Sequence, residues 1–306
     1  MQHLRTWQLL AICVGVWSTT WYAITFQIGA ADPAVGVALR FGLAGAVLLA
    51  MCAWRRLPLC FSPRAHALLV LQGTFLYGVS YVCVYHAEQH LVSGLVAVGY
   101  SASPLAAGIG ARALFGTRLR PRLVLGGVLG GVLGVAGVAL IFWPEFGLAA
   151  GRSGTALGAV FTLASVLLST VGSLAASRNR ANDLPFWPAL AFGMLYGALA
   201  SALIALAQGQ SFALPTTASW WAALLYLSLA GSVPTFACFL TLQQRIGVGP
   251  TGSVGVMTPL LALVVSMAFE RFRPDVLTFA GAALAMSGNV LMLTRAARAT
   301  PAPSGA

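Results

Sequence analysis

The stretch "AEQHLVSGLVAVGYSASPL" (residues 87–105) matches "LQQRIGVGPTGSVGVMTPL" (residues 242–260) without a gap, at an offset of 155 residues. Shorter pairs surround it. "TRLRP" (117–121) and "ERFRP" (270–274) follow two residues out of step, and Ser18-Thr19 similarly pairs with Ser169-Thr170. Similarity that recurs at nearly one offset indicates an internal duplication. We therefore predict one structural unit written twice.

The composition indicates that this chain is embedded in a lipid bilayer. Hydrophobic residues make up 59% of the sequence and charged residues only 8%, and the mean hydropathy is +0.87, values typical of a polytopic membrane protein. The formal charge is +11, but all 17 basic residues are arginine and they lie mostly between apolar runs. The basic excess is therefore interpreted as topological, and no nucleic-acid partner is expected.

About 20 helical residues cross the hydrocarbon core of a bilayer, and ten apolar runs of suitable length are separated by polar breaks. We expect an all-α integral membrane protein with ten transmembrane helices. Their predicted limits are 7–29, 33–53, 66–87, 91–114, 123–143, 154–176, 188–207, 220–243, 249–269 and 274–294.

The duplication divides these helices into two groups of five. We predict a first repeat over residues 1–150, a second over 151–298 and a disordered tail over 299–306. Because five is odd, the second copy must cross the membrane upside down. Inverted repeats of this kind are the architecture of many secondary transporters.

Arginine counting gives the orientation. With ten spans, the loops on the side of the N-terminus carry thirteen arginines and the opposite loops three. The positive-inside rule then places both termini in the cytoplasm.

Two prolines fall near the middle of equivalent spans, Pro104 in the fourth and Pro259 in the ninth. Each removes a backbone hydrogen bond, from the carbonyls of Tyr100 and Gly255 respectively. In lipid such a group needs a partner from protein, water or substrate. The pair is interpreted either as helix breaks at a central substrate site or as packing kinks.

Aromatic and small polar residues on the spans expected to surround a cavity are the candidate substrate contacts. Tyr77, Tyr81 and Tyr85 form a stripe at helical spacing. A cavity lined in this way would suit an uncharged or zwitterionic metabolite with an apolar side chain, although such stripes are also common in packed cores. The full candidate set is Trp17, Ser18, Tyr22, Tyr77, Tyr81, Tyr85, Tyr100, Ser101, Ser103, Ser169, Thr170, Ser173, Phe236, Gln243 and Thr258.

Arg40 is the strongly charged residue placed well inside a span, where charge is costly and functional by default. It could meet a substrate carboxylate, extend toward Asp32, or hold the second span to its neighbours; the structural alternatives are favoured. No acidic residue is expected deep in a span, which argues against a carboxylate proton relay. His86, Glu88 and His90 are interpreted as an interfacial cluster.

The sequence contains no nucleotide-binding loop, metal-ligand spacing or catalytic triad, so we expect no cofactor, no metal and no catalytic residues. The five cysteines show no paired spacing and are interpreted as small core residues. An integral-membrane enzyme that modifies lipid is the rival class, but such an enzyme would gather histidines or acids at one interface.

The stretches "DPAVGVALRFGLAGAVLL" (32–49), "SASPL" (101–105), "MTPL" (257–260) and "ERFRP…GAALAMSGNVLML" (270–293) resemble the EamA family of the drug/metabolite transporter superfamily over nearly the whole chain. The resemblance implies a ten-helix carrier of the bacterial inner membrane, similar to the YddG-type amino-acid exporters. It implies export or facilitated movement of small metabolites, most often amino acids, by a monomer embedded in lipid. The alternative within the superfamily is a multidrug or quaternary-cation exporter. Thr117 departs from the family pattern, which commonly has a glutamate where the second copy has Glu270.

Overall fold

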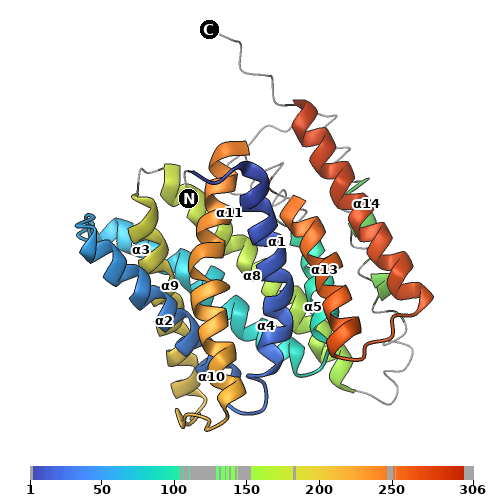
Figure 1. Ribbon diagram of the computed structural model, residues 1–306, viewed down its shortest axis with the longest axis horizontal. Helices are drawn as coiled ribbons and strands as arrows, with labels where there is room; N and C mark the ends of the chain where they lie inside the picture. The colour runs from blue at the N-terminus through green and yellow to red at the C-terminus, as the bar shows by residue number, and fades with distance from the viewer. Residues whose placement is uncertain are drawn as a thin grey trace.

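The computed structural model describes residues 3–103, 106, 110, 129–130, 132–134, 136–137, 139–141, 143, 153–181, 184–246, 251 and 253–299. Apart from one isolated backbone bridge between Ile28 and Ala31, the regular structure of these residues is helical. Figure 1 shows the helices as one bundle, with α14 along its edge.

The first half of the chain contributes seven described elements. They are α1 (Thr6–Thr25), α2 (Pro33–Trp54), α3 (Pro63–Gly73), the π-helical segment η1 (Thr74–Val79), α4 (Ser80–Glu88), α5 (Ser93–Gly99) and the short 3₁₀ turn η2 (Tyr100–Ala102). The elements α3, η1 and α4 follow one another without a break and together form the predicted third span.

The second half repeats the order of the first six of these elements. Its described elements are α8 (Ser153–Ala181), α9 (Phe186–Ala207), α10 (Ala218–Leu225), the π-helical segment η3 (Tyr226–Ala230), α11 (Val233–Ile246), α13 (Ser253–Phe269) and α14 (Val276–Ala299). Residues 300–306 of the predicted tail lie outside the described residues.

Among the described residues, five helical stretches are long and apolar enough to cross a bilayer. They are Pro33–Trp54, Pro63–Glu88, Gly154–Asn179, Phe186–Ala207 and Ala218–Leu242. Their bounds agree within a few residues with the second, third, sixth, seventh and eighth predicted spans. Ten spans stay a prediction: the first predicted span is not among these five, the ninth and tenth contain only the shorter apolar helices Met257–Phe269 and Val276–Gly288, and most of the fifth and part of the fourth lie outside the described residues.

Local chemistry sets the helix ends. Asp32 caps α2 by accepting a hydrogen bond from the backbone N–H of Ala34 at 2.8 Å, and Pro33 occupies the first turn, where its missing N–H costs nothing. At the other end of α2, the N–H of Leu57 donates to the carbonyl of Cys52 at 2.9 Å, with Arg56 in the left-handed region at φ 53°. Such a turn returns the chain sharply toward α3.

The equivalent helix α9 ends in the same way. There the N–H of Gln210 donates to the carbonyl of Ala205 at 2.9 Å, and the left-handed position is Gly209 at φ 68°. Each copy also contains a π-helical segment, η1 in the first and η3 in the second. The duplication is thus visible in local backbone geometry as well as in the sequence.

Equivalent helices of the two copies also pack against each other. Helix α2 contacts α9, α5 contacts α13, and the contact of α4 with α8 has its counterpart in that of α11 with α1. Glycine also permits close approach of α3 and η1 to α9: a Cβ on Gly73 would lie 2.3 Å from the carbonyl oxygen of Gly193, and one on Gly78 would lie 2.9 Å from that of Gly197. Small residues at such contacts are typical of helix pairs in membranes.

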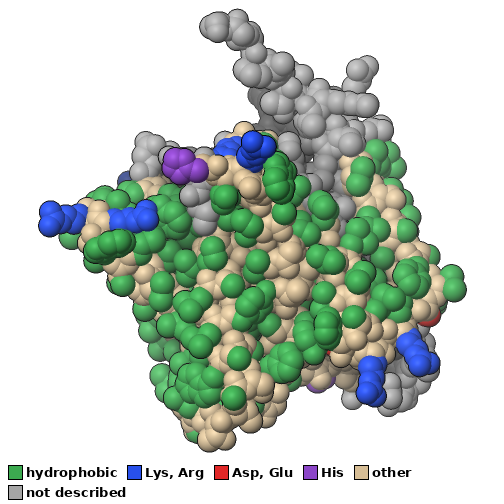
Figure 2. All heavy atoms as spheres, in the orientation of Figure 1, with side chains coloured by type: hydrophobic (Ala, Val, Ile, Leu, Met, Phe, Trp, Pro, Cys, Tyr) green, Lys and Arg blue, Asp and Glu red, His purple; other side chains and the backbone are tan. Residues whose placement is uncertain are grey.

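The face seen in Figure 2 is apolar except at its edges. Figure 2 shows hydrophobic side chains over the visible face and basic side chains at its edges. Leu163, Val160 and Leu203 are among the large apolar side chains that remain more than half exposed. Among the arginine side chains that the structure describes, only Arg40 is buried. This distribution fits a surface that faces lipid, with arginines at the water interfaces.

Candidate substrate site

A chain of aromatic rings links both copies at the centre of the bundle. Trp17 of α1 packs on Phe236 of α11, Phe236 packs on Tyr77 of η1, and Phe41 of α2 packs on both Tyr77 and Tyr81. The ring centroids lie between 4.8 and 5.4 Å apart, within the range of favourable aromatic contact. Four predicted contacts therefore meet here, together with Phe41, which sequence reasoning missed.

Arg40 lies against this chain and is only 1% exposed. Its guanidinium carbon lies 4.7 Å from the ring centroid of Tyr81 and 5.0 Å from that of Phe41. Its Nε donates to Ser232 Oγ at 3.3 Å, whereas Nη1 has no hydrogen-bond partner among the described residues. Arg40 thus holds α2 to its neighbours and does not extend to Asp32, yet one of its charged nitrogens remains available.

Ser232 belongs to a helix break that the sequence interpretation took as continuous span. Residues Gly231 and Ser232 interrupt the helix between η3 and α11, and Pro234 follows. The carbonyls at the break find side-chain donors: Thr235 Oγ1 donates to Ala230 O at 2.7 Å, and Trp17 Nε1 donates to Gly231 O at 3.2 Å. The signal in the sequence was "GSVP" (231–234), in which a proline stands three residues after a glycine.

Tyr85 connects Arg40 to the end of α1. It is 1% exposed, its hydroxyl donates to Gln27 Oε1 at 2.6 Å, and the same hydroxyl faces the Arg40 guanidinium. A Cβ on Gly36, one turn before Arg40, would lie 3.2 Å from the Tyr85 ring, so a glycine at this position lets the ring lie close to α2. Gln27 was not among the predicted contacts.

Glu88 extends the tyrosine stripe by one turn. It is the last residue of α4 and lies three positions after Tyr85, a spacing that places the two on one helix face. Its side chain is 7% exposed, and neither carboxylate oxygen has a hydrogen-bond partner in the part of the chain that the structure describes. The two histidines differ: His86 stacks on Phe161, and His90 is exposed. Glu88 is therefore buried, although its position near the end of a span suggested that it would reach water.

Glu270 is the second carboxylate at this end of the bundle, and it is fully bonded. It accepts hydrogen bonds from the backbone N–H of Ser93 at 3.3 Å, from Ser93 Oγ at 2.6 Å and from Ser266 Oγ. Glu88 and Glu270 are close enough to interact electrostatically. Glu270 thus fastens the start of α5 to the end of α13.

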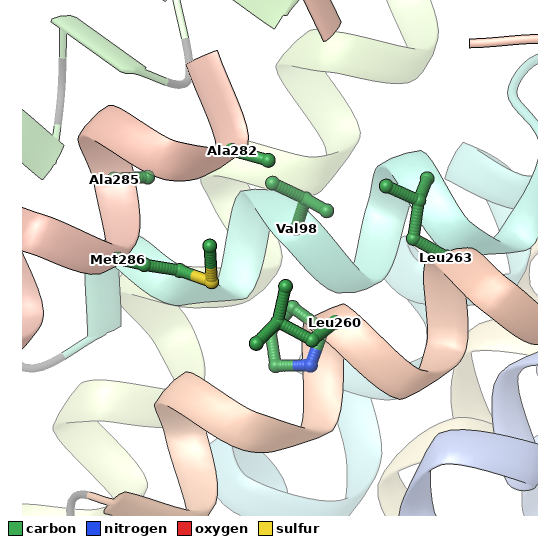
Figure 3. A pocket seen from close by; sticks show the side chains of 7 residues that line it. Val98, Leu260, Leu263, Ala282, Ala285 and Met286 are labelled. Atoms are coloured by element: carbon green, nitrogen blue, oxygen red, sulfur yellow. The ribbon is translucent and has the colours of Figure 1, made fainter. Parts of the chain in front are cut away.

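The predicted helix break at Pro259 lies inside α13. Ser18 Oγ is 2.5 Å from the carbonyl oxygen of Val14 and 3.1 Å from that of Thr258, so α1 contacts α13 beside the proline. Figure 3 shows a small apolar pocket on another side of this proline, between α5, α13 and α14. Val98, Leu263 and Met286 are among its lining residues. The pocket has no polar lining residue and is too small to hold a metabolite.

Other predicted contacts lie away from the centre. Tyr22 stacks on Phe269 and packs on Phe26, two rings that are partly exposed, and Ser173 is exposed. The hydroxyls of Ser103, Ser169 and Thr170 donate to carbonyls of their own helices.

Tyr100 packs on Trp21 and faces the hydroxyls of Ser165 and Ser169. Pro104 and the side chains of Ser101 and Gln243 lie outside the described residues. Within those residues, no group of three or more His, Cys, Asp or Glu side chains could hold a metal.

The model of the EamA-like transporter family matches the chain twice, over residues 5–143 and 156–294. These two matches confirm the two-repeat architecture and the family resemblance.

An "Uncharacterized transporter" of Archaeoglobus fulgidus is 28% identical over 175 residues, a match that covers 55% of this chain and 58% of that protein. The match thus spans less than two thirds of the relative. A solved structure described as "Crystal structure of protein" superposes with a TM-score of 0.66 at 21% identity, over 96% of this chain and 98% of the other. At that identity the likeness shows the fold alone.

Proposed function

Because the chain belongs to the EamA-like transporter family, we propose that this multi-pass membrane transporter moves amino acids or similar small metabolites by alternating access. We place it in the bacterial cytoplasmic membrane with both termini inside. It would export its substrate or let the substrate move down its own gradient. The arginine distribution of the loops supports this orientation.

The observation that carries the proposal is the buried Arg40 beside a helix break. Discontinuous helices at a repeat interface, near the middle of the membrane, are where secondary transporters bind their substrates. Here the break at Gly231 and Ser232 lies in the second copy, and Arg40 from the first copy bonds to it. The free Nη1 of Arg40 offers a charge-assisted hydrogen bond to a carboxylate, and the surrounding rings would receive an apolar side chain.

The same geometry argues against the alternative of quaternary-cation export. Aromatic rings attract cations through their faces, but the guanidinium of Arg40 already lies over the rings of Tyr81 and Phe41. A second cation placed there would be repelled by the first. The rival of a lipid-modifying enzyme gains no support from the family match, which is to a transporter family.

The experiment that tests the proposal is counterflow of radiolabelled amino acids in liposomes that contain the purified protein. We expect leucine and phenylalanine to be taken up when the same unlabelled compound is trapped inside, and protein-free liposomes to take up only background. Uptake of tetraphenylphosphonium in place of amino acids would replace this proposal with cation export. Absence of uptake for every compound would reject small-metabolite transport of this class.

A further inference from the structure

We propose that Gln27, Arg40 and Glu88 form a recognition site for both charged groups of an α-amino acid, with Arg40 and Gln27 binding the carboxylate and Glu88 binding the ammonium. The inference rests on the proposed function and specifies its substrate as a zwitterion. It assigns a role to the buried glutamate, which the sequence interpretation placed in an interfacial cluster.

The donor half of the site consists of two buried nitrogens that lack partners. Arg40 Nη1 and Gln27 Nε2 have no hydrogen-bond partner among the described residues, and the two side chains are 1% and 2% exposed. Both side chains contact Tyr85, whose hydroxyl donates to Gln27 Oε1 and faces the Arg40 guanidinium. A buried donor left unpaired costs about 1–3 kcal/mol. A carboxylate with two oxygens would satisfy both donors.

The acceptor half is Glu88. Its two oxygens are buried and unpartnered among the described residues, on the same helix face as Tyr85 and about 4.5 Å further along the axis of α4, from three residues at 1.5 Å each. An ionised carboxylate without hydrogen bonds is costly to bury. Arg40 is close enough to interact with it electrostatically. An ammonium would supply the missing donors directly.

The combination selects a zwitterion over simpler ions. A cation at Glu88 would leave the donors of Arg40 and Gln27 unpaired, and a carboxylic acid at Arg40 would leave Glu88 unpaired beside the carboxylate of Glu270. A ligand that carries both a carboxylate and an ammonium would supply partners to all three side chains. Electroneutrality of the filled site follows, since one arginine and one glutamate meet one carboxylate and one ammonium.

The test measures binding to purified protein by isothermal titration with leucine, leucinamide and 4-methylpentanoate. Leucinamide lacks the carboxylate charge, and 4-methylpentanoate lacks the ammonium. Wild-type protein should bind leucine at least about tenfold more tightly than either, the factor that the loss of a charge-assisted bond produces. In Glu88→Gln the preference for leucine over 4-methylpentanoate should disappear, while the preference over leucinamide remains.

Glu270→Gln is the matched control. It also removes a carboxylate at this end of the bundle, but one already occupied by Ser93 and Ser266, so the relative affinities should stay as in wild type. Should Glu88→Gln fail to fold, Gln27→Ala gives the complementary result: weaker binding of the two carboxylate-bearing compounds, with leucinamide unaffected.

An unchanged preference in Glu88→Gln, or a wild-type protein that binds none of the three compounds, would overturn the inference. Its failure is distinct from failure of the proposed function. Leucine that binds with the expected pattern but shows no counterflow rejects transport and keeps the site. Counterflow that persists with equal preference in Glu88→Gln rejects the site and keeps transport.

Discussion

The two copies of the five-helix unit are alike in backbone and unlike in charge. Helices α2 and α9 pack against each other and end in the same turn, yet α2 carries the buried Arg40 and α9 has no charged residue. Glu88 of the first copy aligns with Gln243 of the second. Duplication thus produced a frame of paired helices, and the unequal charges within that frame locate the candidate site.

The opposite membrane orientation of the two copies should give the largest measurable effect. Whether an impermeant reagent labels a single thiol is nearly an all-or-none result. The native Cys60 is exposed in a loop assigned to the cytoplasm, and Arg273 is exposed in a loop assigned to the outside. An impermeant maleimide should label Arg273→Cys on intact cells in a Cys60→Ser background, and should label wild-type Cys60 only after permeabilisation. Labelling of both thiols from one side would contradict the inverted relation.

Packing of the two copies against each other should depend on Gly73. A Cβ there would lie 2.3 Å from the carbonyl oxygen of Gly193, and backbone cannot yield as a flexible side chain can. We expect Gly73→Ala to destabilise the protein by about 3 kcal/mol, seen as a lower melting temperature in detergent. Gly15→Ala is the control, since a Cβ on Gly15 meets nothing within 4 Å and alanine favours the helix.

Pro259 tests whether the backbone bond that this proline removes inside α13 matters for transport. Pro259→Ala restores a backbone donor for Gly255 and should stabilise α13, so we expect expression to be kept and amino-acid counterflow to fall about fivefold if opening at this point limits transport. Pro188→Ala, in the first turn of α9, should leave flux unchanged because no helical bond is restored there. Flux that is equal in Pro259→Ala and wild type would reduce Pro259 to a packing kink.

The smallest expected effect comes from the two equivalent turns. Arg56 and Gly209 occupy the same left-handed position after α2 and α9, and a side chain in that conformation costs about 1 kcal/mol. We expect Arg56→Gly to stabilise the protein and Gly209→Ala to destabilise it by about this amount, measured as opposite shifts in melting temperature. Shifts of the same sign would show that the two turns are not equivalent.

The arrangement of the helices into two repeats could largely be predicted from the sequence. Apolar runs of membrane-spanning length indicate the helices, and the internal sequence match indicates the duplication. The five long apolar helices lie within a few residues of their predicted limits, and the predicted duplication is confirmed by the two family matches. The break at Gly231 was missed because an apolar run on both sides conceals it. Its side-chain partners, Trp17 and Thr235, become neighbours only in the folded bundle.

The site was predicted in part. Trp17, Tyr77, Tyr81 and Phe236 meet as expected from their positions on facing spans, whereas Tyr22 and Ser173 face outward, a direction that composition alone does not fix. Glu88 stands at the end of a span, where a carboxylate normally reaches water, and only the packing of α4 reveals its burial.

We place substrate recognition on the charged groups of the first copy, and substitution of Arg40 is the sharpest test of that placement. The measurement is counterflow of leucine and of leucinamide by Arg40→Gln, with its melting temperature recorded beside that of wild type. We expect a folded protein in which leucine flux falls at least about tenfold and leucinamide flux changes by less than about twofold, since only the carboxylate loses a charge-assisted bond. An equal fall for both compounds, or a loss explained by instability, would contradict it and leave Arg40 as a structural link between α2 and the break at Ser232.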